Sequence, residues 1–132
     1  MTAPKILMLG IEPSLIHFDD PAYAAFPGLD AAKVHAGLDR DLAELTRLGF
    51  DASLCLVDFG ETAADVLRQR LTEQRYDCIS MGAGLRLIPQ NTPLFEQLIN
   101  LIHHDAPQAK LGFNTGPTDT AEAVLRWVPA VG

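Results

Sequence analysis

The sequence predicts a single α/β domain in which helices cover both faces of a parallel sheet. Four short apolar segments, typical of buried strands, alternate with four segments of helical periodicity. The connections between them are short except for one long segment after the first strand. At 132 residues the chain is long enough for one hydrophobic core. Because parallel strand–helix–strand units cross over with a right hand, these elements predict a three-layer α/β/α sandwich over residues 1–132.

The first strand, the first helix and the second strand are marked by apolar periodicity and by a glycine. Residues 5–11 are almost entirely apolar and lie between two prolines, which is typical of a strand buried on both faces. Over residues 30–48 apolar side chains recur every three or four positions, which predicts an amphipathic helix. Gly49 is suited to the left-handed residue that ends a helix, with Phe50 as the hydrophobic contact of a Schellman motif. A second strand over 52–57 follows directly.

The rest of the chain repeats the helix–strand alternation. We predict helices over 62–74, 92–106 and 118–128, and strands over 76–81 and 110–114. Thr62 has the spacing of a capping box to the acidic residue three positions later. Thr92 is the expected N-cap of the next helix, with Pro93 at its first position. The last helix begins at Thr118 or Asp119.

The strand order 2-1-3-4 is expected, which is a flavodoxin-like arrangement without a fifth strand. Strand four is then an edge strand, and we hypothesise a homodimer through that strand or through the last helix, where Leu125 and Trp127 lie. Cys55 and Cys78 fall on the strands that flank strand one, too far apart for a disulfide. They are therefore expected to be buried thiols of a reducing compartment.

The charge balance disfavours several classes of partner. Ten Lys and Arg residues stand against 17 Asp and Glu residues, which gives a net charge of −7 and argues against nucleic acid or an anionic membrane surface. The first residues do not resemble a secretory signal or a spanning helix, so we expect a cytoplasmic protein. His17 with Asp19 or Asp20 supplies too few ligands for a metal, and none is expected.

In an open parallel sheet, ligands bind beyond the carboxyl ends of the strands, where the strand order reverses. Here that point lies between strands one and three. The segment 12–32 after strand one is unusually long, and we expect it to cover a site. The alternative is that Pro21 and Pro27 only stiffen a surface excursion.

Two further loops border this point. Gly82 and Gly84 follow the third strand and allow backbone N–H groups to approach an anion, with Arg86 as a bidentate clamp. The motif has no third glycine, and we expect no helix directly after it. The alternative is that the glycines only turn the chain and that Arg86 pairs with a carboxylate.

The segment 113–119 is the second of these loops. Asn114, Thr115 and Thr118 bring an amide and hydroxyl groups next to the start of a helix, which suits an anion. Simple N-capping by Thr118 or Asp119 is the competing interpretation.

These observations predict a protein that binds a small anionic metabolite bearing phosphate or carboxylate. The candidate ligand-binding residues are Glu12, Ser14, His17, Asp58, Gly82, Gly84, Arg86, Asn114, Thr115 and Thr118. If the protein is an enzyme, Glu12, His17 and Asp58 are the available acid–base groups, although no reaction is assigned. The alternative is a non-catalytic, receiver-like dimerisation or protein-interaction module without a phospho-accepting Asp.

The element order resembles the receiver domains of response regulators and the flavodoxins. Receivers carry a phospho-accepting Asp at the end of strand three, where this chain has Met81 and Gly82. Thr115 fits a receiver position, but the fifth strand is absent. Flavodoxins carry a Ser/Thr-rich phosphate loop after strand one, where residues 11–14 here read IEPS. Phosphorylation and FMN are therefore disfavoured, and no cofactor is expected.

Four longer segments are similar to those of a group of small, uncharacterised bacterial proteins without an assigned activity. The segments are HFDDPAY (17–23), GETAADV (60–66), YDCISMGAGLR (76–86) and FNTGPTDTAEAVLRW (113–127). The resemblance covers most of the chain. It implies the flavodoxin-like fold and a bacterial cytoplasmic setting, and it implies no residue roles.

Overall fold

The sheet has four parallel strands in the order β2-β1-β3-β4. The computed structural model describes residues 2–116 and 118–131. The strands are β1 (Lys5–Ile11), β2 (Asp51–Val57), β3 (Cys78–Met81) and β4 (Lys110–Phe113). Strand β1 is central, and it pairs with β2 on one side and with β3 on the other. The predicted strand order and flavodoxin-like class are therefore confirmed.

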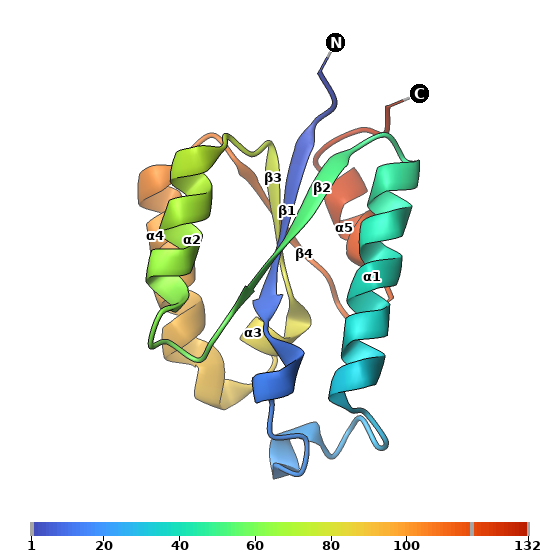
Figure 1. Cartoon of the computed structure of the whole chain (residues 1–132), viewed down its shortest axis with the longest axis vertical. Coiled ribbons are helices and arrows are strands. Elements are labelled where there is room, and N and C mark those ends of the chain that lie inside the picture. The colour runs from blue at the N-terminus through green and yellow to red at the C-terminus, as the bar shows by residue number, and fades with distance from the viewer. Residues whose placement is uncertain (1, 117, 132) are drawn as a thin grey trace.

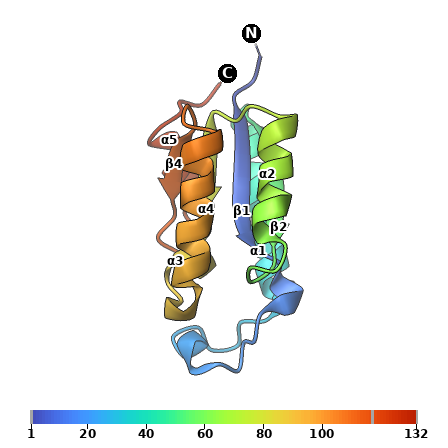
Figure 2. The same ribbon diagram turned by 90° about the vertical axis from the view of Figure 1, so that its left-hand side faces the viewer.

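Helices cover both faces of the sheet (Figure 1). The helices are α1 (Ala31–Arg47), α2 (Ala63–Glu73), α3 (Ala83–Arg86), α4 (Thr92–Asp105) and α5 (Thr120–Leu125). In Figure 1, α1 and α5 lie on one side of the sheet and α2 and α4 on the other. Figure 2 shows α2 and α4 side by side. Three single turns of 3-10 helix, η1 (Pro13–Leu15), η2 (Pro21–Tyr23) and η3 (Pro89–Asn91), each begin at a proline.

The short helix α3 corrects one prediction, because a helix does follow the third strand directly. Gly82 is extended and occupies the N-cap position. Leu85 is fully buried, and its burial draws one helical turn onto the sheet. The turn is closed by a hydrogen bond of 2.8 Å from the Leu87 amide to the Ala83 carbonyl.

Several element boundaries and caps also differ from the predictions. The third strand begins at Cys78, two residues later than expected. Thr92 is the first residue of α4 rather than its N-cap, because the 3-10 turn η3 runs directly into the helix. The last helix begins at Thr120 and ends at Leu125. Asp119 is its N-cap residue, which is one of the two predicted starts, but the Asp119 carboxylate accepts hydrogen bonds from the preceding loop and makes no side-chain cap to the helix.

The end of α1 is the predicted Schellman motif. Gly49 has a φ of 94°, in the left-handed region that favours glycine. Its amide donates to the Thr46 carbonyl at 3.0 Å, and the Phe50 amide donates to the Leu45 carbonyl at 3.1 Å. Phe50 and Leu45 belong to the same buried cluster, which supplies the hydrophobic contact of the motif.

The two faces of the sheet carry separate hydrophobic clusters. Along β1, Leu7, Leu9 and Ile11 belong to the cluster beneath α2 and α4. Ile6 and Met8 belong to the cluster beneath α1 and α5. This alternation follows from the two-residue period of a strand, so a side chain's position in the sequence determines which face it reaches.

The outer strands and the cysteines have simple environments. An arginine caps each edge, since Arg70 donates to the Leu54 carbonyl of β2 and Arg126 donates to the Phe113 carbonyl of β4, both at 2.8 Å. The two cysteines are buried and free on either side of β1. Burial raises the pKa of the Cys78 thiol to about 11, so this group stays protonated.

Among the described residues, none of the helices has the length and apolar character needed to cross a membrane.

Candidate functional site

On the face beneath α1 and α5, the side chains become smaller toward the carboxyl end of the sheet. Along β1, this face carries Ile6, then Met8, then Gly10. Along β3 and the residue after it, Cys78 is followed by Ser80 and then Gly82, at the same two-residue spacing. The sheet therefore leaves space on this face at the point where the strand order reverses.

That space is a cavity of about 490 Å³. It is bounded by α1, by the segment after β1 and by the residues that follow β3 and β4. Its lining is mainly apolar and includes Ile16, Phe18, Tyr23, Phe26, Leu29 and Val34. A volume of this size lies within the range of about 300–1,000 Å³ that is usual for small-molecule sites, and such sites are mostly apolar.

The long segment after β1 forms one side of the cavity, as the sequence predicts for a covering loop. Figure 2 shows it crossing the carboxyl end of the sheet. The rings of Phe18 and Tyr23 pack with their centroids 5.4 Å apart. The loop is held by the Asp20 carboxylate, which accepts from the Ala22 amide at 2.8 Å, and by the Lys33 ammonium, which donates to the Gly28 carbonyl at 2.6 Å.

Two lining glycines are not required by the backbone or by packing. Gly10 and Gly37 do not have positive φ. A Cβ atom on Gly10 would lie 3.9 Å from the nearest atom of Leu56, and one on Gly37 would lie 3.7 Å from the nearest atom of Arg40. Glycine inside a strand or helix costs about 0.5–1 kcal/mol relative to alanine. Both positions line the cavity, so the missing side chains leave space in it.

One chain of polar side chains interrupts the apolar lining. The Asn114 Nδ2 donates to Thr120 Oγ1 at 3.2 Å, and that hydroxyl donates to Asp41 Oδ2 at 2.9 Å. Asn114 and Thr120 are buried, and Asp41 is half-buried. Burial raises the pKa of the Asp41 carboxyl, while the hydrogen bond from Thr120 and the charge of Arg40 oppose the increase.

Sequence reasoning missed Asp41, although a signal is present. Asp41 lies seven residues after Val34 and three after Leu38, so it occupies an inward-facing row of α1. A carboxylate in an apolar row is unusual, and here it reaches a cavity. Lys33 and Arg40, which also line the cavity, fall on the neighbouring row with Gly37.

Of the ten candidate residues, four line the cavity: Gly82, Gly84, Asn114 and Thr118. The other six are not part of its lining: Glu12, Ser14, His17, Asp58, Arg86 and Thr115. Pro117, inside the predicted segment 113–119, lies outside the described residues.

Arg86 has a structural environment rather than the open position expected for an anion clamp. Its Nη2 donates to the backbone carbonyl of Asn114. Its guanidinium also lies over the Phe113 ring, with Cζ 5.3 Å from the centroid. Arg86 thus ties the turn after β3 to the end of β4, and a carbonyl takes the place of the carboxylate that the alternative interpretation required.

The loop after β4 carries its own anion. The Asp119 carboxylate accepts from the Thr115 amide at 2.9 Å, from the Thr115 hydroxyl at 2.7 Å and from the Gly116 amide at 3.0 Å. Burial acts to raise the pKa of Asp119, but these hydrogen bonds outweigh it and lower the pKa. Thr115, one of the three residues of this loop that sequence analysis assigned to a ligand anion, is therefore occupied by the Asp119 side chain.

The loop after β2 is built in the same way. Asp58 accepts from the Thr62 hydroxyl at 2.6 Å and from the Gly60 amide at 3.0 Å. The hydrogen bond from the Thr62 side chain is the largest cause of the lowered pKa of Asp58, followed by those from backbone amides. Asp58 is thus a turn-stabilising residue in this structure.

Among the described residues, no hydrogen bond or ion pair joins the side chains of the candidate acid–base groups Glu12, His17 and Asp58. Glu12 accepts from the Ser14 amide at 2.8 Å, and its carboxylate lies 3.4 Å from His35 Nε2 on α1. The hydrogen bond from the Ser14 amide is the largest cause of the lowered pKa of Glu12. Glu12 thus pairs with a histidine that sequence analysis did not select, instead of with His17 or Asp58.

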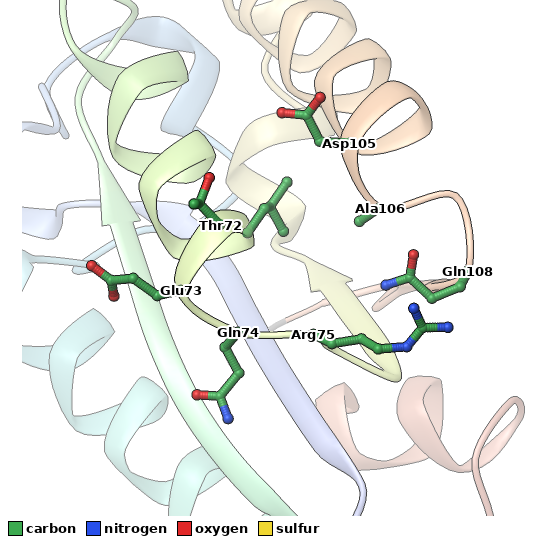
Figure 3. Close-up of a pocket in the computed structure, with 8 residues that line it drawn as sticks. Thr72, Glu73, Gln74, Arg75, Asp105, Ala106 and Gln108 are labelled. Carbon is green, nitrogen blue, oxygen red and sulfur yellow. The ribbon is translucent and has the colours of Figure 1, made fainter.

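A second, smaller hollow of about 240 Å³ lies between the ends of α2 and α4, at the amino-terminal edge of the sheet (Figure 3). Its charged residues Glu73, Arg75 and Asp105 are exposed. In Figure 3, Glu73 and Asp105 lie on opposite sides of the hollow, so the side chains do not converge on one point. Among the described residues, no group of three or more His, Cys, Asp or Glu side chains is arranged to hold a metal ion.

The fold and the cavity together define an α/β/α sandwich of the flavodoxin-like class with an apolar pocket at the point where the strand order reverses. No protein-family model matches the chain, and no curated protein matches it. The cavity is therefore the feature of the structure that suggests a function.

Proposed function

We propose that this protein binds a small metabolite with an apolar body and an anionic group in the cavity beneath α1. The observation that carries the proposal is the cavity itself, an apolar space of about 490 Å³ at the carboxyl end of the sheet. Gly10 and Gly37 support it, because both line the cavity and their missing side chains leave space in it at a cost in intrinsic stability.

Lys33 is the group that best suits the anion. It lies in the first turn of α1, lines the cavity and holds the covering loop through the Gly28 carbonyl. A carboxylate fits this arrangement better than a phosphate. A phosphate needs several converging donors, and those of Thr115 and Gly116 already bind Asp119.

The test uses anilinonaphthalene sulfonate, a fluorescent apolar anion, as the probe. We expect saturable micromolar binding to the folded protein, displacement by octanoate and no displacement by inorganic phosphate. Gly37→Leu places a side chain in the cavity and should weaken binding at least about tenfold, which is roughly 1.4 kcal/mol.

Ala43→Leu is the matched control, since Ala43 is an exposed residue of the same helix that does not line the cavity. Its affinity for the probe should equal that of the wild type. Equal affinity in all three proteins, or no binding to the wild type, would overturn the proposal. Lys33→Met should reduce the affinity for octanoate more than the affinity for octanol, because only octanoate carries the anion.

A second candidate function, a dimerisation or interaction module, is favoured by the surface at the end of α5. Leu125 is 38% exposed and Trp127 is 54% exposed. Arg126 already caps the Phe113 carbonyl on the edge of β4, so the proposed homodimer interface is the helix end rather than the strand. Both candidate functions belong in the bacterial cytoplasm, which the two buried free thiols support.

Light scattering at micromolar concentration tests this second candidate. A homodimer through the helix end gives twice the monomer mass, and Trp127→Ala should return it to the monomer. A wild-type protein of monomeric mass, or a variant that keeps the dimer, excludes this interface.

A further inference from the structure

Three polar side chains of the cavity form one ordered hydrogen-bond chain. Asn114, Thr120 and Asp41 all line the cavity. Asn114 is 8% exposed and Thr120 is 3% exposed, so both are more than nine-tenths buried. The Thr120 hydroxyl links the other two, at 3.2 Å from the Asn114 amide nitrogen and 2.9 Å from the Asp41 carboxylate.

The direction of this chain decides which atom is left without a partner. A hydroxyl has one hydrogen, and Thr120 gives it to the carboxylate of Asp41. Its oxygen must then accept from Asn114, so the amide nitrogen of Asn114 points to Thr120. The amide oxygen remains, and Oδ1 is buried with no hydrogen-bond partner among residues 2–116 and 118–131.

An unpaired buried acceptor destabilises the fold, because burial removes its hydrogen bonds to water and nothing replaces them. The second acceptor beside it is the carboxylate of Asp41, which is half-buried and lines the cavity. The hydroxyl hydrogen of Thr120 is already donated to the Asp41 carboxylate. Two acceptors, Asn114 Oδ1 and the Asp41 carboxylate, therefore meet at this end of the cavity, and the buried amide oxygen has no donor among the described residues. The Arg40 guanidinium also lines the cavity and acts on Asp41 through its charge.

Resting on the function proposed above, we propose that this polar end binds a hydrogen-bond donor of the ligand, a hydroxyl or ammonium group carried on its apolar body. Asp41 follows Lys33 by eight residues, which separates them by about 12 Å along the axis of α1. The ligand class is thus an apolar carboxylate with a donor group at its far end. A six-membered ring with a propionate chain spans this separation when a hydrogen bond at each end is included.

The experiment measures displacement of anilinonaphthalene sulfonate by three probes of the same shape. Phenylpropionate has no donor, its para-hydroxy derivative has a neutral donor and its para-aminomethyl derivative has a cationic donor. In the wild type, at least one donor-bearing probe should displace the dye at about tenfold lower concentration than phenylpropionate, because a charged hydrogen bond is gained.

Two variants distinguish the donors. Asp41→Asn removes the charge but keeps an acceptor, so any preference for the ammonium probe should fall while a preference for the hydroxyl probe persists. Thr120→Val keeps the shape of the side chain and breaks the chain, so a preference for the hydroxyl probe should fall. Asp39 is an exposed residue of α1 outside the cavity lining. Asp39→Asn makes the same charge change as Asp41→Asn and should alter neither the preference for the ammonium probe nor that for the hydroxyl probe.

The outcomes separate the two proposals. If the dye binds and the three probes displace it equally or not at all, the donor assignment is overturned and the proposed function stands. If the dye does not bind the wild type, the proposed function fails and the donor assignment fails with it. A preference for a donor that Asp39→Asn also removes would be a general charge effect, and it would overturn the assignment to Asp41.

Discussion

The two faces of the sheet are packed differently at the carboxyl ends of the strands. Beneath α2 and α4, large side chains such as Leu9, Met81 and Leu98 fill the space and are almost fully buried. Beneath α1 and α5, the corresponding positions are Gly10, Ser80 and Gly82, and a cavity lies between the sheet and α1. At this end of the sheet, one face is filled with large side chains and the other keeps a cavity.

The largest expected effect is a difference in the free energy of unfolding between leucine-to-alanine substitutions on the two faces. Leu98→Ala, in α4 on the filled face, should lower the free energy of unfolding by about 3 kcal/mol, because it removes a fully buried side chain and leaves a void. Leu38→Ala, beside the cavity in α1, should cost less than half as much, since Leu38 is only partly buried. Urea denaturation measures both. Equal losses would mean that the cavity face is packed as tightly as the other.

Arg86→Ala should have the next largest effect, a loss of about 2 kcal/mol in the free energy of unfolding. The substitution leaves the Asn114 carbonyl without its donor and removes the contact with the Phe113 ring. Affinity for anilinonaphthalene sulfonate should change little in the protein that remains folded, because Arg86 does not line the cavity. A stable variant with much weaker dye binding would restore the ligand-clamp role predicted from the sequence.

Arg86 also illustrates the limit of sequence reasoning. Strand order and the Schellman end at Gly49 were predictable, because apolar periodicity marks the strands and helices and a glycine marks the end of α1. The partner of Arg86 was not, since the Asn114 carbonyl is 28 residues away in sequence. The four candidates that reached the cavity follow β3 or β4, where loop position alone was informative.

The cavity itself was hidden for a different reason. A glycine in a buried run, such as Gly10, shows which face it leaves empty only when the register against neighbouring strands is known. The role of Asp119 was hidden as well. Its carboxylate accepts hydrogen bonds from Thr115 and Gly116 and so closes the loop on itself. The sequence places these groups close together, but it does not show that they form hydrogen bonds with one another.

Gly37→Ala should raise the free energy of unfolding by up to about 1 kcal/mol, because alanine is the better helix former and its methyl group has room. Ala43→Gly, the reverse change on the exposed side of α1, should lower it by a similar amount. The two measurements by urea denaturation test whether Gly37 costs stability. A destabilised Gly37→Ala protein would show that the glycine serves packing, and the cavity argument would lose that support.

The smallest effect is electrostatic and has opposite signs in two acidic residues. Burial raises the pKa of Asp41 above its ordinary value of 3.8, so its stabilising contribution is complete below pH 3.8 and is lost as the pH rises through the raised pKa. The pKa of Asp119 is lowered from 3.8 by hydrogen bonds that outweigh burial, so its contribution is present above pH 3.8 and is lost as the pH falls through the lowered pKa.

Asp41→Asn and Asp119→Asn should therefore diverge from the wild type in opposite directions. Between acid and neutral pH, the free energy of unfolding of Asp41→Asn should rise relative to the wild type, and that of Asp119→Asn should fall. Urea denaturation at a series of pH values measures both differences. If the difference for Asp41→Asn instead fell with rising pH, its carboxylate would be stabilised by more than the Thr120 hydroxyl, and the cavity end would hold a donor of the protein's own. The acceptor-rich end inferred above would then be closed to a ligand, which makes this small effect a direct check on the contrast between the two faces.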